Sequence, residues 1–124
     1  MYKIFLIGIA GLGGTLARYW LSGWLDRWWG GSFPFGTLIV NLTGCLTIGF
    51  LFHATEEKYL VDPVVRTALL VGFLGGYTTF SSFAVQSFNL VRDGEIFLAG
   101  ANMLVSNILG FILVWIGYAI SRAL

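Results

Sequence analysis

Apolar residues run along this chain in four long stretches that short polar segments separate. The stretches cover about residues 4–25, 36–52, 64–90 and 96–120. Each is long enough to cross the hydrocarbon layer of a membrane as a helix, for which about 17–25 residues are needed. The pattern predicts an all-α membrane protein with four transmembrane helices. Because these stretches use nearly all of the 124 residues, we expect a single transmembrane domain over residues 1–124.

The composition supports a membrane protein. Hydrophobic residues make up 57% of the chain and charged residues 10%, whereas soluble domains carry about 25% charged residues. The first stretch could be read as a secretory signal, because "TLA" at residues 15–17 is a plausible cleavage site. Its apolar character continues past Arg18 into Trp20, Trp24, Trp28 and Trp29. This cluster is typical of an aromatic belt at the end of an uncleaved helix.

Positive charges are almost evenly divided between the two sides that four crossings define. Both termini share one side with the connection between the second and third stretches. That side carries Lys3, Lys58, Arg66 and Arg122, and the other side carries Arg18, Arg27 and Arg92. Cytoplasmic loops normally hold a clear excess of Lys and Arg. Two hypotheses remain open: insertion in both orientations, which permits an antiparallel homodimer, and one orientation set by a small bias.

No carboxylate lies in the middle of a stretch. Proton-coupled transporters generally need one, so its absence argues against a small proton-coupled exporter. The interior instead offers Arg18 and neutral hydrogen-bonding groups, such as Asn41 on the second stretch and Asn102 and Ser106 on the fourth. Such groups also join helices in membranes. Because Asn102 and Ser106 are four residues apart and share a helical face, they can also line a path for an anion. The acids are Asp26, Glu56, Glu57, Asp62, Asp93 and Glu95.

The third stretch contains the segment "GFLGGYTTFSSF", residues 72–83. Two adjacent glycines followed by threonines destabilise a helix. A break there exposes backbone groups, which a membrane tolerates only where they face protein or a polar cavity. The alternative is a helix that glycine distorts for close packing, with the threonine and serine hydroxyls bonded to their own turn. Phe80 and Phe83 follow on one helical face, where their ring edges can approach an anion.

The remaining reactive side chains have simple interpretations. Cys45 is the only cysteine, so we expect a small packing residue rather than a disulfide or metal ligand. His53 ends the second stretch, and we expect an interfacial residue without a second histidine or carboxylate on its helical face. Glu56, Glu57 and Lys58 are expected to form a solvated loop. Asp62 followed by Pro63 predicts the start of a helix.

Two motifs carry a resemblance to a known family. The segment "GFLGGYTTFSSF" resembles the signature of the CrcB (Fluc) family of fluoride channels, and "GTLIVNLTG", residues 36–44, resembles the second-helix motif of that family. The likeness extends over the whole chain and includes an arginine late in the first helix. Ser82 stands where the pattern often has threonine, which retains the hydroxyl.

The resemblance implies an antiparallel, dual-topology homodimer with a broken third helix and two fluoride pores. It further implies a structural Na⁺ on the dimer axis, held by the backbone carbonyls of Gly75 and Thr78. The implied partners are fluoride, sodium, the lipid bilayer and a second copy of the chain, with no organic cofactor and no nucleic acid. The implied anion-pore residues are Arg18, Asn41, Phe80, Ser81, Phe83 and Ser106.

The implied function is that of a channel and not of an enzyme. A fluoride-selective channel conducts F⁻ passively, and a negative cell interior makes this conduction an export from the cytoplasm that gives fluoride resistance. The expected location is the inner or plasma membrane, crossed several times. Two other hypotheses are a proton-coupled exporter and an accessory subunit that packs against a larger partner.

Overall fold

The protein is entirely helical, as the sequence predicts. A computed structural model describes residues 1–124. Four of its helices are long and apolar enough to cross a membrane, and the chain is a multi-pass membrane protein. The first span is α1 (Tyr2–Trp29), and the second is α2 (Phe35–Phe52), which the π-helix η1 (His53–Glu57) continues. The third span consists of α3 (Pro63–Thr67), the π-helix η2 (Ala68–Phe73), α4 (Leu74–Tyr77) and α5 (Phe80–Arg92). The fourth span is α6 (Ile96–Ala123).

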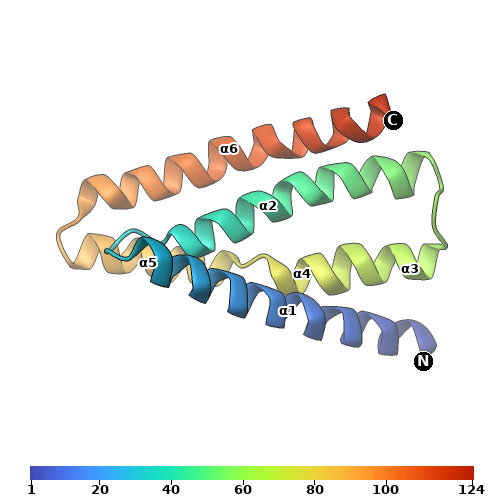
Figure 1. Ribbon diagram of the computed structural model, residues 1–124, viewed down its shortest axis with the longest axis horizontal. Helices are drawn as coiled ribbons and strands as arrows, with labels where there is room; N and C mark the ends of the chain where they lie inside the picture. The colour runs from blue at the N-terminus through green and yellow to red at the C-terminus, as the bar shows by residue number, and fades with distance from the viewer.

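The helices form two pairs that run side by side (Figure 1). Helix α6 lies along α2, and α1 lies along α3, η2 and α4. Both chain ends and the connection from η1 to α3 lie at one end of the bundle (Figure 1). The connections from α1 to α2 and from α5 to α6 lie at the other end. This arrangement follows from short connections, which leave consecutive helices antiparallel.

Glycines set the distance between the paired helices. A Cβ atom added to Gly49 would overlap the carbonyl group of Val114, and one added to Gly117 would overlap the carbonyl of Leu46. Helices α2 and α6 therefore approach with backbone against backbone. On the other pair, a Cβ on Gly72 would lie 2.7 Å from the carbonyl oxygen of Ile7. Small residues permit such contacts in membranes, where dispersion rather than the hydrophobic effect holds helices together.

The third span changes backbone conformation at two threonines. Helix α4 ends at Tyr77, and Thr78 (φ −84°, ψ 154°) and Thr79 (φ −147°, ψ 113°) are extended. Helix α5 then begins at Phe80, with the Thr79 hydroxyl accepting a hydrogen bond from the backbone N–H of Ser82 at 3.2 Å. At the start of the span, Asp62 caps α3 by accepting from the N–H of Val64 at 2.8 Å, which confirms the predicted helix start.

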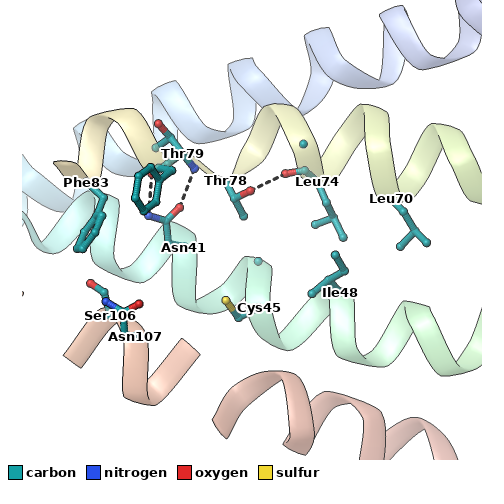
Figure 2. A pocket seen from close by; sticks show the side chains of 13 residues that line it. Asn41, Cys45, Ile48, Leu70, Leu74, Thr78, Thr79, Phe83, Ser106 and Asn107 are labelled. Atoms are coloured by element: carbon teal, nitrogen blue, oxygen red, sulfur yellow. Dashed lines mark hydrogen bonds between the residues drawn. The ribbon is translucent and has the colours of Figure 1, made fainter. Parts of the chain in front are cut away.

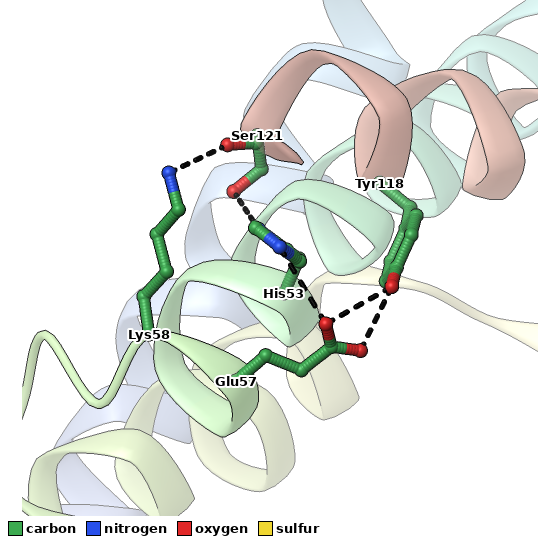
Figure 3. A network of polar contacts seen from close by, with 5 residues as sticks. All are labelled: His53, Glu57, Lys58, Tyr118 and Ser121. Atoms are coloured by element: carbon green, nitrogen blue, oxygen red, sulfur yellow. Dashed lines mark hydrogen bonds and ion pairs between the residues drawn. The ribbon is translucent and has the colours of Figure 1, made fainter. Parts of the chain in front are cut away.

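The expected solvated loop after the second span is wrong in part. Residues 53–57 continue α2 as η1, and the side chains of His53 and Glu57 bond to α6 (Figure 3). His53 is buried, and Glu57 lies one turn further on the same helical face, 3.5 Å from its ring, so the expected absence of a carboxylate is also wrong. The helix continues because polar groups on α6 satisfy these side chains, a tertiary effect that composition does not reveal.

Candidate functional site

The extended residues of the third span are joined to α2 through Asn41. Its side-chain amide donates from Nδ2 to the carbonyl oxygen of Thr79 at 3.1 Å, and its Oδ1 accepts from the N–H of Thr79 at 2.8 Å (Figure 2). One carboxamide thus satisfies both backbone groups of the same residue. Buried backbone groups without partners are costly, so this pairing stabilises the extended conformation.

A second side chain reaches the same region from α1. Arg18 donates from Nε to the carbonyl oxygen of Gly76 at 3.0 Å. In a continuous helix, that carbonyl would accept from the N–H of residue 80, four positions on. The extended threonines remove this partner, and Arg18 replaces it. The arginine expected to line the anion path therefore bonds to backbone.

Two carbonyl groups of the region stay without hydrogen bonds. Neither Gly75 nor Thr78 accepts a bond through its carbonyl oxygen from a side chain or from backbone outside the helices. The N–H of Thr79, which would bond to Gly75 in a helix, bonds to Asn41 instead. A Cβ added to Gly75 would meet nothing within 4 Å, so this side of α4 faces open space.

A cavity of about 370 Å³ lies beside the extended residues (Figure 2). Its wall is formed by helices α2, α4, α5 and α6, together with Leu70 of η2 and the extended residues Thr78 and Thr79. No acidic or basic side chain lines it. The lining residues are Asn41, Gly44, Cys45, Ile48, Leu70, Leu74, Gly75, Thr78, Thr79, Phe80, Phe83, Ser106 and Asn107.

The structure brings together four of the six anion-pore residues implied by the resemblance: Asn41, Phe80, Phe83 and Ser106 line the cavity. The rings of Phe80 and Phe83 lie 5.7 Å apart at 50°. The Ser106 hydroxyl oxygen is buried and has no hydrogen-bond partner in the protein. The remaining two residues, Ser81 and Arg18, do not line it, because Ser81 is exposed on another face of α5 and Arg18 lies on α1.

Comparison with known proteins identifies the family. The family model described as "CrcB-like protein, Camphor Resistance (CrcB)" matches residues 5–118. A protein named "Fluoride-specific ion channel FluC" from Geotalea uraniireducens is 40% identical over 124 residues, with 100% of each chain covered. Proteins of the same name from Geotalea daltonii and Desulforapulum autotrophicum are 42% and 44% identical, with 97–98% of each chain covered. The chain belongs to the CrcB family.

In this CrcB-family chain, sequence reasoning missed some of the residues that line the cavity. Cys45 lies on the wall between Asn41 and Ile48, in agreement with its place one turn after Asn41 on α2. Asn107 also lines the cavity, although its Nδ2 donates to the carbonyl of Met103 in its own helix at 2.7 Å. The four-residue spacing of Asn41 and Cys45 could have indicated the first of these.

Proposed function

We propose that this chain is a fluoride-selective channel that conducts F⁻ passively. The observation that carries the proposal is the cavity at the extended threonines, whose wall combines neutral donors with phenylalanine rings and contains no charged side chain. Relatives that match the chain over its whole length are named fluoride-specific ion channels, and none of those compared is named as an enzyme.

The chemistry of the wall suits a small anion that must shed water. The Asn41 amide uses one N–H on Thr79 and keeps the second for a ligand. The Ser106 hydroxyl has no protein partner and can donate to an anion. The edges of Phe80 and Phe83 carry partial positive charge. A set of donors that replaces the hydration shell of an ion is the general basis of selective conduction.

The functional unit of the proposal is an antiparallel, dual-topology homodimer with a broken third helix. Phe80 is 79% exposed in the single subunit, although it lines the cavity, so a second copy would complete the wall. The even division of positive charge supports insertion in both orientations. Adding two lysines to one terminus tests the pairing. Full activity in a single forced orientation would contradict the antiparallel dimer.

A structural Na⁺ fits the residues at the break. Sodium is a hard cation that prefers oxygen ligands. The carbonyl oxygens of Gly75 and Thr78 are without hydrogen bonds, and Gly75 faces open space. These carbonyls would hold the ion, and its charge would stabilise two break regions brought together. Ser81 is exposed on α5, and Arg18 lies on α1. We keep both as proposed contributors to the anion path on one condition, which is that the second subunit of the dimer places them beside it.

Passive conduction distinguishes this proposal from a proton-coupled exporter. In the cell, the membrane potential would drive fluoride out and lower its cytoplasmic concentration. Purified protein in liposomes, given a potassium gradient and valinomycin, should release fluoride and retain chloride, at a rate that a pH gradient leaves unchanged. Transport that requires a pH gradient would favour an exporter. Absence of release would leave the accessory role.

A further inference from the structure

His53 is the only histidine of the chain and is buried at the end of the bundle that holds both termini. It is the first residue of η1, and Tyr118 and Ser121 of α6 lie against it (Figure 3). The cluster takes no part in the cavity, since His53 lies twelve residues beyond Asn41, about 18 Å along a helix axis. His53 is therefore a buried titratable group outside the cavity.

Both ring nitrogens of His53 have polar neighbours. Nδ1 lies 3.0 Å from Oγ of Ser121, and Nε2 lies 3.5 Å from Oε2 of Glu57. In the neutral ring, the serine hydroxyl donates to Nδ1 while Nε2 carries the proton that faces Glu57. In the charged ring, both nitrogens donate and the serine oxygen accepts. In either protonation state, each ring nitrogen therefore has a polar neighbour suited to it.

The carboxylate of Glu57 is held in place by α6. The Tyr118 hydroxyl donates to it and lies 2.9 and 3.0 Å from its two oxygens. The Tyr118 ring also meets the imidazole edge to face, with centroids 5.0 Å apart at 77°. Glu57 is thus fixed toward His53 rather than free to turn into water, although about half of its side chain is exposed.

Other charges at this end are few and partly paired. Lys58 donates from Nζ to the carbonyl oxygen of Ser121 at 3.1 Å. Its positive charge opposes a second positive charge nearby, that of a protonated His53. Arg122 follows Ser121 in α6. Glu56 and Arg66 pair with each other at 2.9 Å. Glu57 is therefore the anion that a charged His53 meets directly.

We propose that His53 and Glu57 form a proton-binding site that ties the end of the second span to the last turns of α6 more firmly when the imidazole is charged. Histidine ordinarily changes charge between about pH 5 and 8. A charged ring forms an ion pair with Glu57, whereas a neutral ring lies 3.5 Å from the carboxylate without a hydrogen bond to it. Because Gly49 and Gly117 hold α2 and α6 backbone to backbone, the tie stabilises the register of the helices that carry Asn41 and Ser106.

The single histidine makes a direct test possible on the unmodified protein. Histidine-selective ¹⁵N labelling reports on His53 alone. These resonances show whether the imidazole takes up a proton as the pH falls from about 8 to about 5. Over the same range, hydrogen-exchange protection of Ser121 to Ala123, corrected for intrinsic rates, should rise about two- to fivefold toward acid pH. Ring resonances that stay fixed, or unchanged protection, would overturn the proposal.

A double-mutant cycle of His53→Gln and Glu57→Gln gives a second test, read as thermal unfolding in detergent. The two changes should be coupled by about fivefold in the unfolding constant near pH 5.5 and should be additive near pH 8. The pair Glu56→Gln and Arg66→Gln is the control, because neither group normally titrates in that range. Equal coupling of His53 and Glu57 at both pH values would contradict a proton-dependent tie. If a variant does not fold, the labelled wild type still decides.

Discussion

The carboxamide of Asn41 forms two hydrogen bonds with one residue, Thr79, across 38 positions of the chain. Its Nδ2 donates to the Thr79 carbonyl at 3.1 Å, and its Oδ1 accepts from the Thr79 N–H at 2.8 Å. Asn41 therefore holds the extended backbone and also lines the cavity. The sequence suggests Asn41 as a pore residue, and the structure gives it a supporting role in the backbone of the third span.

Replacing Asn41 by alanine should lower both stability and flux. The change leaves the N–H and carbonyl of Thr79 without partners, and we expect a loss of about 1–2 kcal/mol in the free energy of unfolding. Asn107→Ala is the matched control for the stability measurement alone, because its amide bonds only to its own turn. Thermal unfolding in detergent measures the first effect and fluoride release from liposomes the second. A fully stable Asn41→Ala protein would contradict the supporting role.

Ser106→Ala should separate conduction from stability. The Ser106 oxygen has no partner in the protein, so its removal should change the free energy of unfolding by less than about 0.5 kcal/mol. A hydrogen bond to an ion is worth about 1.5–3 kcal/mol, so fluoride flux should fall about tenfold or more. Thr47→Ala removes a hydroxyl that bonds to its own helix and does not line the cavity. It should leave flux unchanged, and an equal loss in both variants would remove Ser106 from the path.

Two glycines of α6 should respond oppositely to alanine. Gly117→Ala places a methyl group against the carbonyl of Leu46 and should cost about 1–3 kcal/mol of stability. Gly100→Ala meets nothing within 4 Å and should gain up to about 1 kcal/mol from helix propensity. Thermal unfolding of the two proteins in detergent measures the difference. A Gly117→Ala protein as stable as the wild type would show that α2 and α6 separate without cost.

Removal of sodium should destabilise the proposed dimer. Replacing Na⁺ by N-methylglucamine leaves the Gly75 and Thr78 carbonyls without a cation, because that ion is too large to enter between them. We expect a lower unfolding temperature and a slower fluoride flux, both restored by added Na⁺. Size-exclusion chromatography with light scattering follows the dimer. Stability and flux that do not depend on Na⁺ would count against the ion site.

The sequence by itself determined the four spans, because the length and hydropathy of an apolar stretch decide whether it can cross a membrane. It also drew attention to residues 75–79, because adjacent glycines and threonines weaken a helix locally. The helix start at Asp62 depends on neighbouring residues alone, so local reasoning found it.

Only the tertiary structure decided which side chains satisfy the backbone near Thr79. Asn41 and Arg18 reach it from other helices, and no spacing along the chain encodes that distance. It also turned Ser81 away from the cavity that Phe80 and Phe83 line. His53 and Glu57 became part of a helix because Tyr118 and Ser121 lie opposite them on α6. Contacts between segments distant in sequence depend on how whole helices pack, and local composition does not contain that information.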